Sequence, residues 1–381
     1  MLNENEKNII QQTVPVLQEK GVAITSYFYK SMFNQHPELK NMFNQTNQKK
    51  GLQSTALAQS VLAAAMNIED LTRILPVVEE IAYKHCALQV PPAGYDIVGK
   101  HLLEAIQEVL DLDSEDEIVV TWGKAYQEIA DVFIKVEQQI YEQMAWEGFE
   151  SFEILQIEQV STDIKSFTVK SEQFDFSHFT PGQFITVDIE SEHLPYRAKR
   201  HYSIIEGNND TLTFAVKRDT STEHEGEVST VLHDEYKVGD QIQLSAPVGA
   251  FSIQNETHPQ LFIGSGIGVT PLIPMFKQLS KGENEVNFIQ NTSDINDVPF
   301  EETLTEIAES GNNSSYVIYD KRKNGYIDES YLKNYINDET EIYVCGGQSF
   351  LQSMIETLKA MGIAPSKIHF ESFIPKLSIQ A

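Results

Sequence analysis

The spacing of apolar side chains changes character twice along the 381-residue chain. In residues 1–147, apolar positions recur at i, i+3 and i+4, as on one face of a helix, and no alternating run interrupts them. This spacing is seen in VPVLQEKGVAITSYFYKSMF, STALAQSVLAAAMNI, LTRILPVVEEIAYKHCAL, GKHLLEAIQEVL and TWGKAYQEIADVFIKVEQQIYEQMA. The first part of the chain is therefore predicted to be all-helical.

Short alternating runs replace the helical spacing from about Phe152 onward. They are FEILQIEQV, SFTVK, QFITVDI, RHYSIIE, TLTFAVKR and QIQLSAP, separated by the turn residues PG, GNND and VGD. Such runs predict an antiparallel barrel or sandwich. From Pro259 onward, strands of buried type alternate with helical stretches, which is typical of an α/β domain with a parallel sheet. We place the three domains at 1–147, 148–258 and 259–381.

Charge and cysteine content narrow the range of partners. The chain has 28 Lys and Arg against 56 Asp and Glu, so its formal charge is -28 and it repels nucleic acid and anionic lipid. The start, MLNENEKNII, lacks the apolar run of a signal peptide, and the longest apolar stretch is too short to span a bilayer. The two cysteines, Cys86 and Cys345, indicate no disulfide framework. We expect a cytoplasmic protein with no nucleic acid and no obligatory membrane partner.

Three segments in the second half of the chain suggest nucleotide chemistry. The tetrapeptide at 200–203, RHYS, by itself reads as ordinary strand sequence. It is followed by GEVSTVL at 226–232, where amides at the start of a helix and the Ser229 hydroxyl can hold a pyrophosphate, with Arg200 as the cation. The third segment, GSGIGVTP at 264–271, lies between a strand and a helix, where glycines allow phosphate to approach the backbone.

In this order, the three segments make residues 152–375 resemble the ferredoxin-NADP reductase-like superfamily. That family pairs a flavin-binding β-barrel with a nicotinamide-binding α/β domain. The residues that match its flavin contacts are Phe184, Arg200, His201, Tyr202, Ser203, Val228, Ser229, Glu371, Ser372 and Phe373. The residues that match its nicotinamide contacts are Gly266, Ile267, Gly268, Val269, Thr270, Pro271, Cys345 and Gly346. Two positions depart from the family pattern: Gly347 stands where Pro is usual, and Ile374 precedes Pro375 where Gly-Pro is usual.

The helical half contains a histidine, His85, just before a helix break at Pro91-Pro92, with a helical pattern resuming at Tyr95. A lone histidine in a helix is usually a core or surface residue. Its surroundings follow the pattern KHxxxxVxPxxYxIVGxHLL, which resembles the flavohaemoglobin family. This resemblance covers essentially the whole chain and implies haem b, with His85 as the proximal iron ligand.

The resemblance also places Tyr95 and Glu137 beside His85, and Lys84 on the side of the flavin. A carboxylate that accepts the far N–H of a ligating histidine fixes the ring's tautomer and makes it a stronger electron donor. Such a donor favours oxygen chemistry over reversible oxygen carriage.

The opposite face of the predicted haem pocket is assembled from four residues. Phe43 follows Pro37 between two helices, where a globin holds its haem with an aromatic ring. Gln53 and Leu57 lie four residues apart and so share one helical face, and Tyr29 stands in an apolar helix. Each is compatible with core packing when taken singly. Together they predict a pocket in which Tyr29 and Gln53 donate hydrogen bonds to a gas ligand and Leu57 restricts access.

The resemblance therefore implies a nitric oxide dioxygenase with haem b, FAD and NADH or NADPH as cofactors. NAD(P)H would pass a hydride to FAD, FAD would deliver single electrons to haem, and O2 and nitric oxide would be converted to nitrate. We expect a monomer. One alternative is an oxygen-binding haem sensor or carrier with an attached reductase, and another is a flavin reductase in which haem is secondary. No basic residue in the sequence decides between NADH and NADPH.

Overall fold

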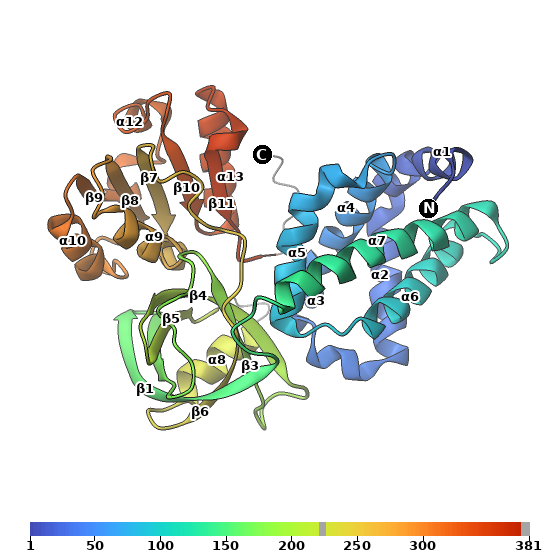
Figure 1. Cartoon of the computed structure of the whole chain (residues 1–381), viewed down its shortest axis with the longest axis horizontal. Helices are drawn as coiled ribbons and strands as arrows, with labels where there is room; N and C mark the ends of the chain where they lie inside the picture. Colours follow the sequence, from blue (N-terminus) through green and yellow to red (C-terminus); the bar gives the residue numbers. More distant parts are fainter. Residues whose placement is uncertain (221–225, 375–381) are drawn as a thin grey trace. The chain divides into compact units, whose positions relative to one another are not determined.

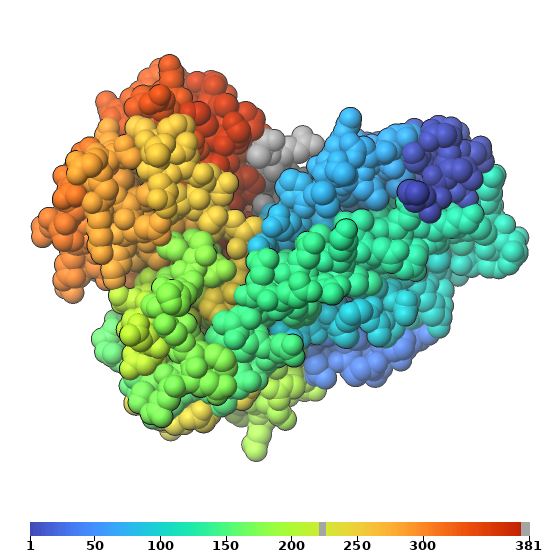
Figure 2. Space-filling view, in the orientation of Figure 1, coloured from blue at the N-terminus to red at the C-terminus, as the bar shows by residue number. Residues whose placement is uncertain are grey.

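The computed structural model describes residues 1–220 and 226–374. The chain divides into a helical unit built mainly from Met1–Gly148 and a second unit built mainly from Phe149–Val187 and Arg200–Ile374. The helical unit is coloured blue to green in Figure 1, and the same colours mark its surface in the space-filling view (Figure 2). Among the described residues, no helix combines the length and apolarity that crossing a bilayer requires.

The helical unit confirms the all-α prediction for the first domain. Its elements are α1 (Glu4–Gln12), α2 (Val14–Gln35), η1 (Pro37–Asn41), α3 (Gln45–Lys49), α4 (Leu52–Met66), η2 (Leu71–Ile74), α5 (Leu75–Leu88), α6 (Ala93–Leu110) and α7 (Glu117–Tyr141). Asn3 begins α1 with a capping box, because its side chain accepts from the Glu6 amide and Glu6 accepts from the Asn3 amide. The core includes the buried side chains of Phe28, Met32 and Trp122.

The break between α5 and α6 follows from three residues. Gln89 ends α5 in the left-handed region with φ 61°, and Pro91-Pro92 come next, where they cannot extend the preceding helix. The helix restarts at Ala93, two residues before the restart at Tyr95 that the sequence predicts. Pro92 is the residue from which the new helix can start, because its fixed φ suits a helical start and its missing N–H is not needed there.

The first part of the second unit is a closed antiparallel barrel, so the sequence's choice between barrel and sandwich is resolved in favour of the barrel. Its strands are β1 (Phe149–Ser161), β2 (Ile164–Lys170), β3 (Phe184–Ile189), β4 (Ala198–Gly207), β5 (Thr211–Lys217) and β6 (Gln241–Ser245), with α8 (Glu227–Asp234) between the last two. They close in the order β1-β2-β5-β4-β3-β6. The first strand begins three residues before the predicted position, Phe152.

The last part is a five-stranded parallel sheet flanked by helices, as predicted. Its elements are β7 (Gln260–Ser265), η3 (Gly266–Val269), α9 (Leu272–Leu279), β8 (Val286–Thr292), α10 (Glu301–Ser310), β9 (Ser314–Asp320), α11 (Lys321–Asn324), α12 (Glu329–Leu332), β10 (Glu341–Cys345), α13 (Gln348–Ala360), η4 (Pro365–Lys367) and β11 (Ile368–Glu371). The order β11-β10-β7-β8-β9 places β7 at the point where the strand order reverses. Ligands of such sheets bind outside the carboxyl ends of the strands at that point.

Close packing of α6 on α7 leads to a testable prediction. A Cβ atom on Gly99 would lie 2.5 Å from Cε1 of Tyr126, whose hydroxyl donates to the Tyr95 carbonyl at 2.6 Å. We expect Gly99→Ala to destabilise the helical unit by about 1–3 kcal/mol, because overpacking outweighs the gain in helix propensity. The matched control is Gly123→Ala, whose Cβ would meet only Leu103 Cδ1 at 3.5 Å. Calorimetry of the full-length chain should show a lower transition midpoint for the first variant only; equal midpoints would contradict the prediction.

Candidate functional site

Three helices bring a histidine, a tyrosine and a glutamate together. His85 of α5 donates from Nδ1 to Oε1 of Glu137 on α7 at 2.8 Å. The Tyr95 hydroxyl of α6 donates to the same carboxylate oxygen at 2.5 Å and lies 3.0 Å from His85 Nδ1. The Phe133 ring packs against the imidazole at 5.8 Å. The helix break after Gln89 thus returns the chain so that Tyr95 reaches His85, as the sequence predicts.

Burial shapes the hydrogen bonding of this cluster. Glu137 is 2 % exposed, and within residues 1–220 and 226–374 no donor reaches its Oε2. A buried carboxylate needs hydrogen-bond donors, so the proton of His85 is held at Nδ1 and the Nε2 lone pair stays available. Burial, reinforced by Glu137, raises the pKa of Tyr95, which therefore remains a donor. Burial also raises the pKa of the Cys86 thiol to about 12, so this neighbour stays neutral.

The same surroundings fit a haem. The His85 side chain is 31 % exposed, although the next two residues, Cys86 and Ala87, are buried. Phe43, Leu57, Val61 and Val98 pack on the helical core and yet remain only partly buried. The flat, apolar haem macrocycle is a group that could bury the apolar surface that these side chains leave exposed. His85 Nε2 would bind the haem iron, with Glu137 orienting the ring from the other nitrogen.

The ring of Tyr29, on α2, lies among three other aromatic rings. Its ring stacks on Phe33 at 5.8 Å and meets Phe28 and Phe43 edge-on at 4.8 and 5.7 Å. Burial raises its pKa, so the phenol stays protonated and able to donate. Gln53 lies on α4 one turn before Leu57, as predicted.

One further residue in this region, Gln48 of α3, was not predicted. Its Nε2 donates to Gln53 Oε1 at 2.5 Å. It stands in the polar segment NQTNQKKG, where no apolar spacing or family motif drew attention to it.

Lys84 precedes the histidine on α5. Its Nζ lies 3.8 Å from Oε1 of Glu80 one turn earlier, which is a helical ion pair. Its orientation toward the flavin stays a prediction.

Seven of the ten predicted flavin residues lie on β3, β4 and the start of α8, and the other three, Glu371, Ser372 and Phe373, lie at the end of β11 and after it. The Phe184 ring of β3 lies 4.9 Å from the His201 ring of β4, and Nδ1 of His201 lies 2.7 Å from the Thr186 hydroxyl. Tyr202 stacks on Phe214 of β5 at 5.7 Å, and Ser203 is buried. Contacts with neighbouring strands of the barrel therefore hold the His201 and Tyr202 side chains in place.

The start of α8 lies next to the RHYS strand. The Arg200 guanidinium is 3.9 Å from the Glu227 carboxylate in the first helical turn. Ser229 donates to the Gly226 carbonyl at 3.2 Å and accepts from the Asp219 amide at 3.1 Å, and Val228 is buried beside it. The two predicted pyrophosphate segments are thus brought together, and the Ser229 hydroxyl is already engaged with the backbone of its own turn.

The two nicotinamide motifs pack backbone against backbone. A Cβ atom on Gly268 would lie 2.4 Å from the Cys345 carbonyl oxygen and 2.6 Å from Gly346 Cα. The motifs follow β7 and β10, which are neighbours in the sheet, so both lie at the carboxyl edge where the strand order reverses. Gly266 has φ 55°, which favours glycine.

The rest of the glycine-rich motif completes this turn. Ile267 and Val269 belong to η3, the Thr270 hydroxyl donates to the Ile267 carbonyl at 2.8 Å, and Pro271 precedes the first residue of α9. Cys345 is buried, and burial raises the pKa of its thiol, so it is a neutral side chain.

The two departures from the family pattern have different outcomes. Gly347 precedes α13 with φ -64°, the value that proline would impose, so the substitution leaves the backbone path unchanged. At the other departure, Ser372 donates from its hydroxyl to the Ile374 carbonyl at 3.2 Å and from its amide to Glu371 at 3.0 Å, and Phe373 is 46 % exposed. Pro375 lies outside the described residues.

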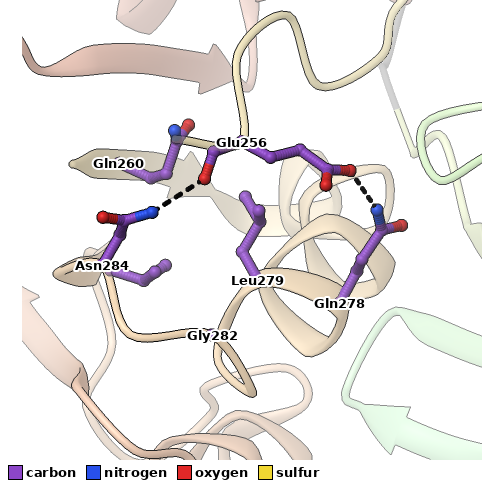
Figure 3. Close-up of a pocket in the computed structure, with 7 residues that line it drawn as sticks. Glu256, Gln260, Gln278, Leu279, Gly282 and Asn284 are labelled. Carbon is purple, nitrogen blue, oxygen red and sulfur yellow. Dashed lines mark hydrogen bonds between the residues drawn. The ribbon is translucent and has the colours of Figure 1, made fainter. Parts of the chain in front are cut away.

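A cavity of about 110 Å³ lies away from these motifs, next to the start of β7 (Figure 3). Its lining is Glu256, Gln260, Gln278, Leu279, Gly282, Asn284 and Val286. Gln278 donates to the Glu256 carboxylate at 2.6 Å, and Asn284 donates to the Glu256 carbonyl at 2.9 Å (Figure 3). These bonds tie the loop before β7 to α9 and to the loop that follows it. Since nucleotides bind at the carboxyl ends of the strands, this cavity at the amino end is not the cofactor site.

Comparison with known protein families assigns the three parts of the chain. Residues 26–133 match the globin family, residues 151–253 match the oxidoreductase FAD-binding domain, and residues 262–356 match the oxidoreductase NAD-binding domain. These matches support the predicted cofactors haem, FAD and a nicotinamide dinucleotide.

Relatives and solved structures extend over the whole chain. A flavohemoprotein of Oceanobacillus iheyensis is 40% identical, with 98% of this chain and 97% of the relative covered, and one of Bacillus subtilis is 38% identical, with 100% and 99% covered. The structure of a flavohemoglobin from Malassezia yamatoensis with bound FAD and heme has the same fold, at a TM-score of 0.86, 24% identity and coverage of 98% and 99%. The FAD/NAD-binding domain of a nitric oxide dioxygenase from Vibrio cholerae matches at a TM-score of 0.52 and 27% identity, covering 58% of this chain and 97% of that one.

The contact between the two nicotinamide motifs leads to a second prediction. In Gly268→Ala the new methyl group must displace the Cys345–Gly346 backbone, and we expect NAD(P)H-dependent ferricyanide reduction to fall at least about tenfold, since an ångström-scale shift in a binding turn has large kinetic effects. The matched control is Gly347→Ala, because a Cβ there meets nothing within 4 Å and φ is already negative. Its rate should stay within about twofold of wild type. Similar losses in both variants would show that the close approach at Gly268 is not what matters.

Proposed function

This chain belongs to the flavohemoprotein (flavohaemoglobin) family, and we propose that it is a nitric oxide dioxygenase that oxidises nitric oxide with O2 to nitrate. Its domains make it a haem globin reduced by NAD(P)H through FAD, and a globin domain implies gas ligands such as O2. We also propose 1–147, 148–258 and 259–381 as the domain limits. The dioxygenase proposal rests mainly on the 2.8 Å hydrogen bond from His85 Nδ1 to the buried Glu137 carboxylate.

That hydrogen bond supports oxygen chemistry over oxygen carriage. Haem, when bound, supplies an iron that exchanges single electrons and accepts diatomic gases. Glu137 holds the proton at Nδ1 and places a negative charge in a buried site, which increases electron donation from Nε2. Tyr95 shares the same carboxylate oxygen and so fixes its position. An oxygen carrier or sensor, the alternative kept from the sequence, works with a weaker proximal donor.

The opposite side of the pocket supplies a neutral donor in an apolar setting. Tyr29 stays protonated because burial raises its pKa, and its hydroxyl can donate to a polar diatomic molecule. Phe43 packs against the Tyr29 ring, and Leu57 belongs to the same apolar cluster, and apolar surroundings of this kind strengthen a hydrogen bond made within them.

The reductase half has the parts that convert a two-electron donor into single electrons. The β7–η3 turn and the Cys345–Gly346 turn lie in contact at the carboxyl edge of the sheet, where NAD(P)H would bind. Arg200 and the start of α8 would bind the pyrophosphate of FAD. NAD(P)H gives up a hydride, which carries two electrons, and a flavin can pass them on one at a time.

The deciding experiment measures nitrate. The full-length protein loaded with haem and FAD, given NADH, air and nitric oxide, should form one nitrate for each nitric oxide consumed. The control variant His85→Ala should lose nitrate formation and haem while still reducing ferricyanide, because its flavin residues lie in the other unit. Nitrate formation by wild type no faster than by His85→Ala would refute the proposal and leave a carrier, a sensor or a plain flavin reductase.

The role of Tyr29 can be tested by removing only its hydroxyl. Tyr29→Phe keeps the contacts with Phe28, Phe33 and Phe43, so folding and haem content should barely change. Losing a hydrogen bond to a partly charged oxygen should cost ~1.5–3 kcal/mol, or about tenfold to hundredfold faster O2 release. Nitrate formation should fall most at low oxygen, and flavin-to-haem electron transfer should not change. Stopped-flow O2 release is the measurement, and identical rates would make Tyr29 a packing residue.

A further inference from the structure

A carboxylate at the amino end of the parallel sheet is held by two histidines. Glu341, the first residue of β10, is 6 % exposed, and each of its carboxylate oxygens has a histidine partner. Its Oε1 lies 3.0 Å from Nδ1 of His258, in the loop before β7, and its Oε2 lies 2.8 Å from Nε2 of His369 on β11. The cluster therefore connects β10 with the segment before β7 and with β11, an edge strand of the sheet (Figure 1).

The direction of these hydrogen bonds follows from the surroundings. The Asn255 side-chain oxygen accepts from the amide and the hydroxyl of Thr257, at 2.9 and 2.7 Å. Asn255 therefore turns its NH2 group to His258 Nε2, at 3.1 Å, and that ring nitrogen accepts. The proton of His258 then lies on Nδ1 and is donated to Glu341. Burial would raise the pKa of Glu341, but hydrogen bonds from His369 and His258 outweigh burial and lower it, so the group they donate to is a carboxylate.

Packing fixes the His369 ring as well. It lies 4.7 Å from the ring of Tyr343, at an angle of 30°, and Tyr343 is its partner in the parallel pairing of β10 with β11. Tyr343 is fully buried, and its hydroxyl accepts from the Gln254 amide at 2.8 Å. Glu341 lies two residues before Tyr343 and so on the same face of β10. His369 thus contacts two successive side chains on one face of its neighbouring strand.

This contact matters because apolar burial alone does not fix the register of β11. The strand has four residues, and Ile368 is the one that is buried. A slip by two residues keeps every side chain on its own face of the sheet, and one such slip would replace Ile368 by Phe370, which is also apolar. The ring of His369, which stacks on Tyr343 and donates to Glu341, has no counterpart two residues away in either direction of the sequence.

The register of β11 sets the position of the residues that follow it. Glu371 ends the strand and pairs with Cys345, which comes just before Gly346. Ser372 donates from its amide to Glu371 and from its hydroxyl to the Ile374 carbonyl, so hydrogen bonds within this segment hold its local shape. Its place along the carboxyl edge of the sheet depends on β11.

We propose that Glu341 and His369 are positioning residues that fix the register of β11 and thereby place the segment 371–373 at the flavin. The inference rests on the proposed function for the contact between that segment and FAD. It deepens the proposed function, because a cluster at the amino end of the sheet is given a part in arranging a binding segment at the carboxyl end.

Two substitutions of His369 separate positioning from packing. His369→Leu removes the donor and keeps an apolar side chain. His369→Gln keeps an N–H group close to the place of Nε2, so it should restore the hydrogen bond to Glu341. The matched control is Tyr316→Phe on β9, the edge strand on the other side of the sheet. Tyr316 donates to Gln290 Oε1 of β8 at 2.6 Å, so the control also removes a side-chain hydrogen bond between an edge strand and its neighbour, but away from the flavin segment.

The measurements are FAD release from the diluted full-length holoprotein, followed by flavin fluorescence, the flavin midpoint potential and the calorimetric transition. We expect His369→Leu to bind FAD about threefold to tenfold more weakly and to shift the flavin potential, the usual size of an effect exerted through another group. His369→Gln should stay within about twofold of wild type. Tyr316→Phe should lower the transition midpoint and leave FAD release and the flavin potential unchanged.

FAD release and a flavin potential like those of wild type in His369→Leu would overturn the proposal. Equal changes in Tyr316→Phe would overturn it too, because a general loss of stability in the sheet would then explain them, and so would a failure of His369→Gln to restore binding. If His369→Leu does not fold, Glu341→Gln takes its place with the same expectations, since the amide keeps the shape of the carboxylate but not its charge. None of these readings uses nitric oxide, so a wild-type protein that makes no nitrate would refute the dioxygenase while this test still stands.

Discussion

The helical unit is organised around a carboxylate that has been taken out of water. Glu137 is 2 % exposed, and burying such a charge without donors costs several kcal/mol. Two donors offset that cost, the His85 ring and the Tyr95 hydroxyl, and they come from two other helices. Helices α5, α6 and α7 must therefore meet within hydrogen-bond distance. The left-handed residue Gln89 and the close approach of α6 to α7 at Gly99 are features that make this meeting geometrically possible.

Much of this could be predicted from the sequence, because the features involved are local or belong to a motif. Helical spacing, alternating runs and buried strands predict the three kinds of domain, since each depends on a repeat of apolar positions over a few residues. His85, Tyr95 and Glu137 could be named because they match a family pattern, and their contacts in the structure agree with it. Their roles in catalysis remain proposals.

The rest could not be predicted, because it depends on contacts between segments that carry no pattern. Gln48 stands in a polar stretch, and only the fold brings it to Gln53. The engagement of Ser229 with its own turn depends on the path of the backbone at Gly226. The packing of Gly268 against Cys345 depends on β7 and β10 being neighbours, although the strands are far apart in sequence. In each case the missing information is which elements are adjacent.

Gly347 shows that a family motif can be conserved as a torsion angle while its residue changes. The position needs φ near -64° and has open space where a side chain would lie. Proline holds that angle by its ring, and glycine reaches it at a cost in chain entropy alone. A Cβ atom at this site would meet open space, whereas a Cβ atom at Gly268 would meet backbone atoms. Pattern searches that require proline after Cys-Gly would overlook chains of this kind, and searches that require the glycine of the β7 turn would not.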